Sequence, residues 1–236
     1  MLLSFLKSSD HWWQSPQRCV LCHDLAGHLY LCAECADLIG GLRICNGVCP
    51  SCAKPSLQDA VCGECQRQPR HYDRLWASYR LDWPLHQLIA QYKFQRTWSH
   101  AALFGLWMAQ APPPWLHQCV FDAVIAMPLS RSRLHERGFN QAQLLVDALL
   151  PMVLLTSTQL NRPIIERQHR PPQSTLNYIQ RQLNTKGIFQ LKSDVNKRNL
   201  LLIDDVVTTT ATLNELARIL KAAGAASVSC WVLSRA

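Results

Sequence analysis

Apolar and polar residues alternate in long blocks through the second part of the chain. Four short apolar runs predict buried strands: RLWASYRL (74–81), FDAVIAM (121–127), LLLID (200–204) and SVSCWVLS (227–234). Between them, apolar residues recur at helical spacing in PLHQLIAQYKF (84–94), HAALFGLWMAQA (100–111) and GFNQAQLLVDALL (138–150). Strands separated by helices predict an α/β domain with a parallel sheet, and such sheets bind ligands beyond the C-terminal ends of their strands.

Polar clusters follow two of these predicted strands. PLSRSRLHERGFNQ comes after FDAVIAM, and DDVVTTTAT comes after LLLI and opens a predicted helix. Neither G-x-x-x-x-G-K-[ST] nor G-x-G-x-x-G occurs, so the sequence does not support an ATPase or a dinucleotide-binding enzyme. Residues 1–70 hold 6 Lys and Arg and 6 Asp and Glu, whereas residues 71–236 hold 18 and 10. The whole excess of +8 therefore lies in the second part, where we expect an anionic partner to bind.

Eight of the eleven cysteines form two copies of the pattern C-x2-C-x9-C-x2-C. They are Cys19, Cys22, Cys32 and Cys35, then Cys49, Cys52, Cys62 and Cys65. Two C-x-x-C turns supply four thiolates, the ligand set of a structural zinc ion, and structural disulfides rarely form from such pairs. The repeat predicts two zinc ions per chain, with one ion per unit favoured and an interleaved pairing left open. We expect a double zinc-ribbon-like region at 1–68 and an α/β domain at 69–236.

The segment from residue 200 to 212 carries a resemblance to a known motif. An apolar strand, D-D and then T-T-x-x-T resembles the phosphoribosyl diphosphate (PRPP) motif of type I phosphoribosyltransferases. MPLSRSRLHERGFNQAQLL, the later PPQSTL…R…N…F run and the twin cysteine units are similar to the ComF/GntX family over nearly the whole chain. The resemblance implies a type I phosphoribosyltransferase-like parallel sheet flanked by helices, a small zinc-binding region, and a role in competence or the use of external DNA.

The same resemblance implies roles for individual residues. Asp204 and Asp205 would be catalytic and accept hydrogen bonds from the ribose hydroxyls, while Mg²⁺ accompanies PRPP or another sugar phosphate. The phosphate and diphosphate groups would be bound by Thr208, Thr209, Thr210, Ala211, Thr212, Arg131, Arg133, Arg137 and Lys93. From the residues alone, the aspartates could instead form a solvated turn or helix cap, and the arginines a solvated helix face. The basic segment RPIIERQHRPPQ (162–173) predicts either a lid or a plain loop.

Thr210 departs from the motif, which has glycine at that position. Glycine adopts positive φ readily, whereas β-branched threonine does so at a cost. The sequence therefore predicts a loop that is strained, rearranged or already helical, and weaker phosphate binding than in a glycine-bearing relative. On this reasoning Thr210→Gly should tighten PRPP binding.

Three functions fit these patterns. The first is an enzyme that transfers or hydrolyses the phosphoribosyl group. The second is a DNA-uptake adaptor that binds single-stranded DNA or the proteins of the uptake machinery, with Trp12, Trp13, Tyr92 or Trp98 stacking on bases. The third is a non-catalytic scaffold with a PRPP-type pocket. No apolar run is long enough to span a bilayer and no signal peptide is apparent, so we expect a cytoplasmic protein.

Overall fold

A computed structural model describes residues 18–27, 30–94, 99–153, 158–159, 165–167 and 188–236. Its helices are α1 (Ala33–Gly40), α2 (Gly63–Arg67), α3 (Leu85–Phe94), α4 (His100–Gln110), α5 (Arg131–Arg137), α6 (Gln141–Val153) and α8 (Ala211–Ala222). Its strands are β1 (Arg74–Arg80), β2 (Ala123–Ala126), β3 (Thr158–Gln159), β4 (Ile165–Arg167), β5 (Phe189–Leu191), β6 (Asn199–Val207) and β7 (Ser227–Arg235).

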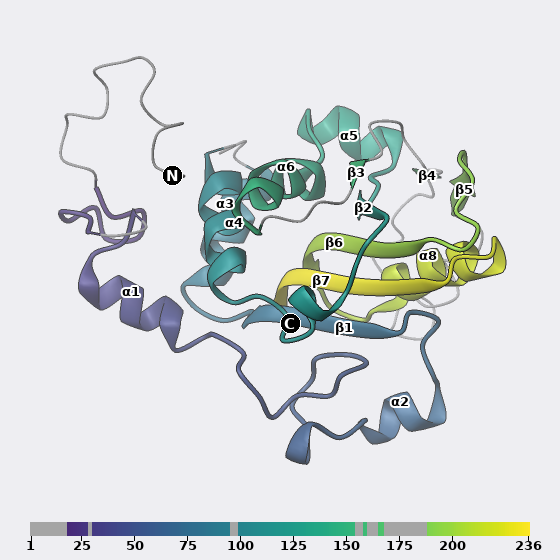
Figure 1. Cartoon of the computed structure of the whole chain (residues 1–236). Helices are drawn as coiled ribbons and strands as arrows, with labels where there is room; N and C mark the ends of the chain where they lie inside the picture. Colours follow the sequence, from purple (N-terminus) through teal and green to yellow (C-terminus); the bar gives the residue numbers. More distant parts are fainter. Residues whose placement is uncertain (1–17, 28–29, 95–98, 154–157, 160–164, 168–187) are drawn as a thin grey trace, which may run out of the picture. The chain divides into compact units, whose positions relative to one another are not determined.

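Five strands form one sheet in the order β1-β7-β6-β2-β3, and each neighbouring pair runs parallel (Figure 1). This confirms the predicted parallel α/β fold. The central strand β6 shows why the pattern works, because Leu200, Leu201, Leu202 and Ile203 are all fully buried. Alternate residues of a strand point to opposite faces, so a continuous apolar run belongs to a strand that is covered on both sides.

Helices cover both faces of the sheet at β6. Leu200 and Leu202 belong to the same core cluster as Leu213, Leu216 and Leu220 of α8. Leu201 and Ile203 point to the other face. There α6 contacts β6 and β2, and α4 packs on α6 (Figure 1).

The described residues divide into two compact units, one that ends at Gly41 and one that runs from Leu42 to Ala236. The second cysteine unit thus lies in the same compact unit as the sheet, whereas the predicted boundary falls after residue 68. Backbone hydrogen bonds explain the difference: Arg80 N donates to Leu42 O at 2.8 Å and Ile44 N donates to Ser78 O at 2.9 Å. Residues 42–44 therefore pair along the free edge of β1, which a reading of cysteine spacing could not foresee.

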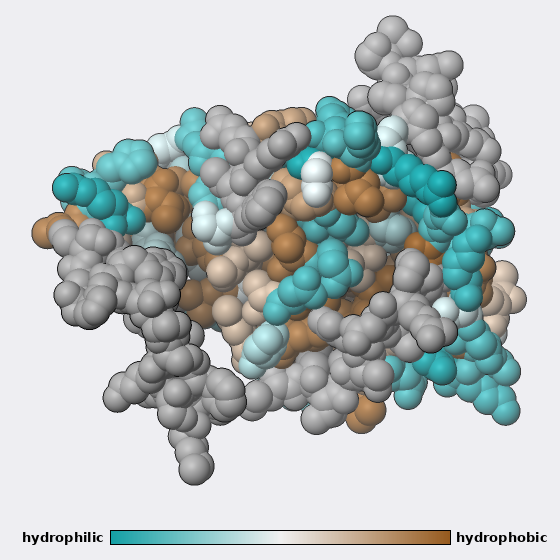
Figure 2. Space-filling model, turned by 90° about the horizontal axis from the view of Figure 1, so that it is seen from above, coloured by the Kyte–Doolittle hydropathy of each residue, from teal (hydrophilic) through white to brown (hydrophobic). Residues whose placement is uncertain are grey.

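Within the part of the chain that the structure describes, we find no helix that is both long and apolar enough to cross a membrane. Figure 2 shows that hydrophilic and hydrophobic residues are interspersed on the face seen there.

Candidate anion-binding site and metal centres

A pocket of about 170 Å³ lies beyond the C-terminal ends of β2 and β6. Of the residues predicted to bind the ligand, all but one line it: Lys93, Arg133, Arg137, Asp204, Asp205, Thr208, Thr209, Thr210, Ala211 and Thr212. Met127, Leu129, Arg167, Val206, Val207 and Leu213 complete the lining. Residues from helices α3 and α5, strand β6 and the start of α8 thus meet at one edge of the sheet, where parallel sheets place their ligands.

The two aspartates stand in different environments. Asp205 is buried, and its Oδ2 lies 3.1 Å from Lys93 Nζ, so the carboxylate is held by an ion pair. Asp204 Oδ1 accepts a hydrogen bond of 2.9 Å from Asp205 N. Burial, followed by the charge of Asp205, raises the pKa of Asp204 to about 7, although Lys93 and Arg167 oppose the rise. Asp204 therefore changes protonation state near neutral pH.

The threonine loop has the backbone shape expected of a glycine-bearing loop. Thr210 has φ 56° and ψ −6°, which is the left-handed region, and α8 begins directly after it. Its carbonyl accepts a hydrogen bond of 2.8 Å from Asn214 N, which closes the first turn of α8. Of the three forms predicted for this loop, the structure shows the strained one. Thr210, Ala211, Thr212 and Leu213, at the start of α8, all line the pocket. The N–H groups at a helix N-terminus favour anions.

Three arginines give the pocket its positive charge. Arg137 donates to Gln141 Oε1 at 3.0 Å and lies 5.7 Å from the centre of the Phe94 ring, and these contacts hold its guanidinium in place. Arg167 lies 5.7 Å from the Phe189 ring, and burial lowers its pKa, with Arg133 adding to that effect. With Lys93, these side chains set four positive charges against the two aspartates, so the pocket suits an anionic ligand.

The cysteines gather into two clusters of four. Cys19, Cys22, Cys32 and Cys35 form one, and Cys49, Cys52, Cys62 and Cys65 form the other, with the sulfur atoms of each set within 4.8 Å of one another. The Sγ atoms of Cys22 and Cys32 lie 3.5 Å apart, and those of Cys52 and Cys62 lie 3.7 Å apart. A tetrahedron with metal–sulfur bonds of about 2.3 Å has edges of about 3.8 Å. Both clusters therefore fit a metal ion, and the predicted sequential grouping is confirmed.

Comparison with known proteins places these features in a family. Residues 142–236 match the Phosphoribosyl transferase domain. The chain is 32% identical to Competence protein F of Haemophilus influenzae over 211 residues, which cover 81% of this chain and 91% of that protein. It is 33% identical to DNA utilization protein YhgH of Shigella flexneri over 197 residues, covering 80% and 84%. The chain belongs to the ComF family.

A solved structure of Trypanosoma cruzi hypoxanthine phosphoribosyl transferase is also similar to this ComF-family chain. The similarity covers 61% of this chain and 66% of that one, at 15% identity and a TM-score of 0.35. The assignment of the fold rests instead on the order and direction of the strands and on the matched domain.

Two arginines of this ComF-family protein differ from the prediction. Arg131 is outside the pocket lining: its side chain is 86% exposed and its Nη2 lies 2.6 Å from Glu166 Oε1. Arg167 takes a place in the pocket that the sequence did not assign to it. The available signal was the basic segment 162–173. The backbone of Arg167 is joined by a parallel β-bridge to Ser130, just before α5, and this long-range pairing was not visible in the sequence.

Proposed function

We propose that the pocket binds PRPP together with Mg²⁺ and that the protein acts on the phosphoribosyl group. One observation carries the proposal: the adjacent aspartates, the threonine loop at the start of α8 and the three arginines meet in a single cavity. A sugar that bears phosphate at one end and diphosphate at the other matches a cavity that combines two carboxylates with a threonine loop and three arginines.

In this proposal each group of residues binds the part of PRPP that suits its chemistry. Asp205, paired with Lys93, accepts hydrogen bonds from the ribose hydroxyls, and Asp204 shares this role when deprotonated. The N–H groups and hydroxyls of the threonine loop donate to the 5′-phosphate. The arginines hold the diphosphate, which bears more negative charge as it departs, so they stabilise the transition state more than the ground state. Magnesium, bound with the substrate, would neutralise part of that charge.

Thermal denaturation with PRPP and Mg²⁺ tests this proposal. We expect millimolar PRPP with Mg²⁺ to raise the melting temperature of the wild-type protein, because a ligand that binds the native state stabilises it. Asp205→Asn should remove that rise. Asp37→Asn is the matched control, since Asp37 is an exposed aspartate of α1. The proposal fails if PRPP leaves the wild-type melting temperature unchanged, or if Asp205→Asn responds as the control does.

A second candidate function is that of an adaptor in DNA uptake, and the names of the relatives favour it. Single-stranded DNA would meet the basic pocket rim through its phosphates. Tyr92 is not available for stacking, because it is fully buried and its hydroxyl donates to Gln141 O at 2.8 Å. The predicted stacking residues Trp12, Trp13 and Trp98 lie outside the described residues. Both functions are compatible with the predicted cytoplasmic location.

Gel-shift titrations separate the adaptor from the enzyme. Affinity for a single-stranded oligonucleotide should fall steeply as salt rises, and it should fall further in the double variant Arg133→Gln/Arg137→Gln. An affinity that does not change with salt, or that is the same in the double variant as in the wild type, would show that the pocket does not bind the DNA.

A further inference from the structure

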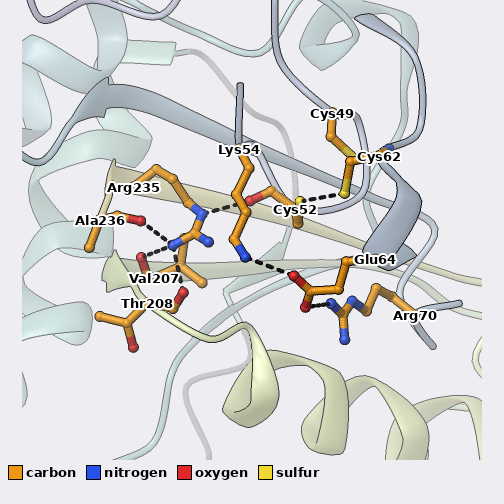
Figure 3. Close-up of polar contacts among 10 residues, drawn as sticks. All are labelled: Cys49, Cys52, Lys54, Cys62, Glu64, Arg70, Val207, Thr208, Arg235 and Ala236. Atoms are coloured by element: carbon orange, nitrogen blue, oxygen red, sulfur yellow. Dashed lines mark hydrogen bonds and ion pairs between the residues drawn. The ribbon is translucent and has the colours of Figure 1, made fainter. Parts of the chain in front are cut away.

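The second cysteine cluster is joined to the threonine loop by one buried side chain. Arg235, at the end of β7, donates from Nε to Cys52 O at 2.8 Å. Its Nη1 donates to Val207 O at 3.0 Å and to Thr208 O at 2.6 Å. Figure 3 shows the guanidinium between the cysteine turn on one side and the loop on the other. A single cation thus bonds to the backbone of a metal-ligating turn and to the backbone of the loop.

These bonds orient the loop toward the pocket. In a trans peptide the N–H group of one residue points opposite to the C=O group of the residue before it. When Arg235 holds the carbonyls of Val207 and Thr208, the amides of Thr208 and Thr209 must point away from Arg235. Thr208 and Thr209 line the pocket, whereas Arg235 is absent from its described lining. Arg235 therefore stands behind the loop and fixes the direction of two amides that can donate to a phosphate.

Tyr72, two residues before β1, makes a further hydrogen bond to the same cysteine turn. Its hydroxyl donates to Ser51 O, which lies between the ligands Cys49 and Cys52, at 2.5 Å. Burial raises the pKa of Tyr72, so its phenol stays protonated and able to donate this hydrogen bond.

The cluster is itself braced by an ionic network. Glu64, next to the ligand Cys65, lies 2.7 Å from Lys54 Nζ and 2.8 Å from Arg70 Nη2 through its two oxygen atoms (Figure 3). These contacts hold the two C-x-x-C turns close together. They do not replace the metal, because four thiolates at such short separations need a cation to hold them in one geometry.

We propose that a metal ion bound by Cys49, Cys52, Cys62 and Cys65 sets the conformation of the phosphate-binding loop, with Arg235 as the positioning residue that transmits it. The proposal rests on the proposed function, in which residues 208–212 bind the phosphate of PRPP. It goes beyond a folding role for the metal, because it couples metal binding to ligand binding. By linkage, a ligand in the pocket should strengthen metal binding at this cluster.

The internal repeat supplies a matched pair of variants. Cys62→Ser removes one ligand from the second cluster, and Cys32→Ser removes the equivalent ligand, at the start of α1, from the first. Each should lower the metal content from two ions to one. PRPP–Mg²⁺ affinity, measured by calorimetry, should fall at least tenfold in Cys62→Ser and less than twofold in Cys32→Ser. Equal affinities in the two variants would overturn the proposal.

Arg235→Lys tests the positioning residue with the metal retained. Lysine keeps the charge but cannot reach both turns with a rigid fork. We expect both metal ions to remain bound and PRPP affinity to fall about fivefold to twentyfold. Arg80→Lys is the control, since Arg80 is the exposed register partner of Arg235 on β1. Wild-type affinity in Arg235→Lys would show that the guanidinium does not act on the loop.

Two further measurements test the proposal if the variants unfold or if PRPP does not bind. In wild-type protein, saturating PRPP should slow the removal of one metal ion by a chelator and leave the other unaffected; unchanged removal of both contradicts the coupling. Hydrogen exchange at Asn214, whose amide donates to Thr210 O, needs no ligand. It should be at least tenfold faster in Cys62→Ser than in Cys32→Ser. If PRPP fails to bind wild-type protein, the proposed function falls, and this exchange rate alone decides whether the cluster holds the loop.

Discussion

Replacing Thr210 by glycine and by alanine should separate backbone strain from side-chain effects. Thr210 is 3% exposed and holds φ 56°, a conformation that costs a residue with a Cβ about 1–2 kcal/mol and costs glycine nothing. Alanine keeps that strain, whereas glycine relieves it but loses about 0.5–1 kcal/mol more backbone entropy on folding. Both variants lose the same buried side-chain atoms beyond Cβ, so their difference contains only the backbone effects and the burial of a single Cβ. The glycine variant should be the more stable by about 0.5–1 kcal/mol, or roughly 1–4 °C in melting temperature.

The same geometry changes what we expect for the ligand. From the sequence, Thr210→Gly should tighten PRPP binding. That result requires strain that arises only when the ligand binds. The structure places the strain in the free protein, so it is present before and after binding and cancels from the affinity. PRPP should therefore bind Thr210→Gly with nearly wild-type affinity, within about twofold. Calorimetry and thermal melts on the three proteins measure both quantities. A glycine variant that binds several times more tightly and is no more stable than the alanine variant would refute this reasoning.

Two further predictions concern stability without ligand. The pKa of Asp204 is raised to about 7, so its contribution to stability is fully present below about pH 4 and is lost as the pH rises through 7. Urea unfolding at pH 5.5 and at pH 8 should therefore show that the wild type loses stability relative to Asp204→Asn. Parallel pH profiles for the two proteins would contradict this prediction. Gly105→Ala should lower the free energy of unfolding by about 1–3 kcal/mol, because a Cβ at residue 105 would lie 3.0 Å from the Ala148 Cβ of α6. Gly40→Ala in α1 is the control, because a Cβ at residue 40 meets no atom within 4 Å.

The sheet and the pocket were largely predictable because their signals are local. A continuous apolar run such as 200–203 requires a strand buried on both faces, and the residues directly after it must lie at the C-terminal edge of the sheet. The cysteine spacing likewise determined which four sulfur atoms gather in each cluster. In each case, the residues that carry the information are close together in the chain and are restricted by backbone geometry or metal coordination.

The positions that the sequence did not predict depend on long-range contacts. Arg131 and Arg133 stand two residues apart on α5, so they point to different sides of the helix, and only Arg133 faces the pocket. The choice between them depends on Glu166, which pairs with Arg131 from a distant segment. Arg167 reaches the pocket through that same segment. Composition and periodicity carry no information on such pairings.

The two cysteine units show how identical motifs acquire different roles. Both have the same spacing and the same four-sulfur geometry, so metal chemistry alone does not distinguish them. The difference lies in residues outside the repeat. Tyr72 and Arg235 bond to the carbonyls of Ser51 and Cys52, and they come from the start and the end of the α/β part of the chain. Because such carbonyls are acceptors in any C-x-x-C turn, the motif becomes a support for the loop only where a buried donor reaches it. The second unit therefore belongs physically with the pocket, and the structure assigns the first unit to a separate compact body.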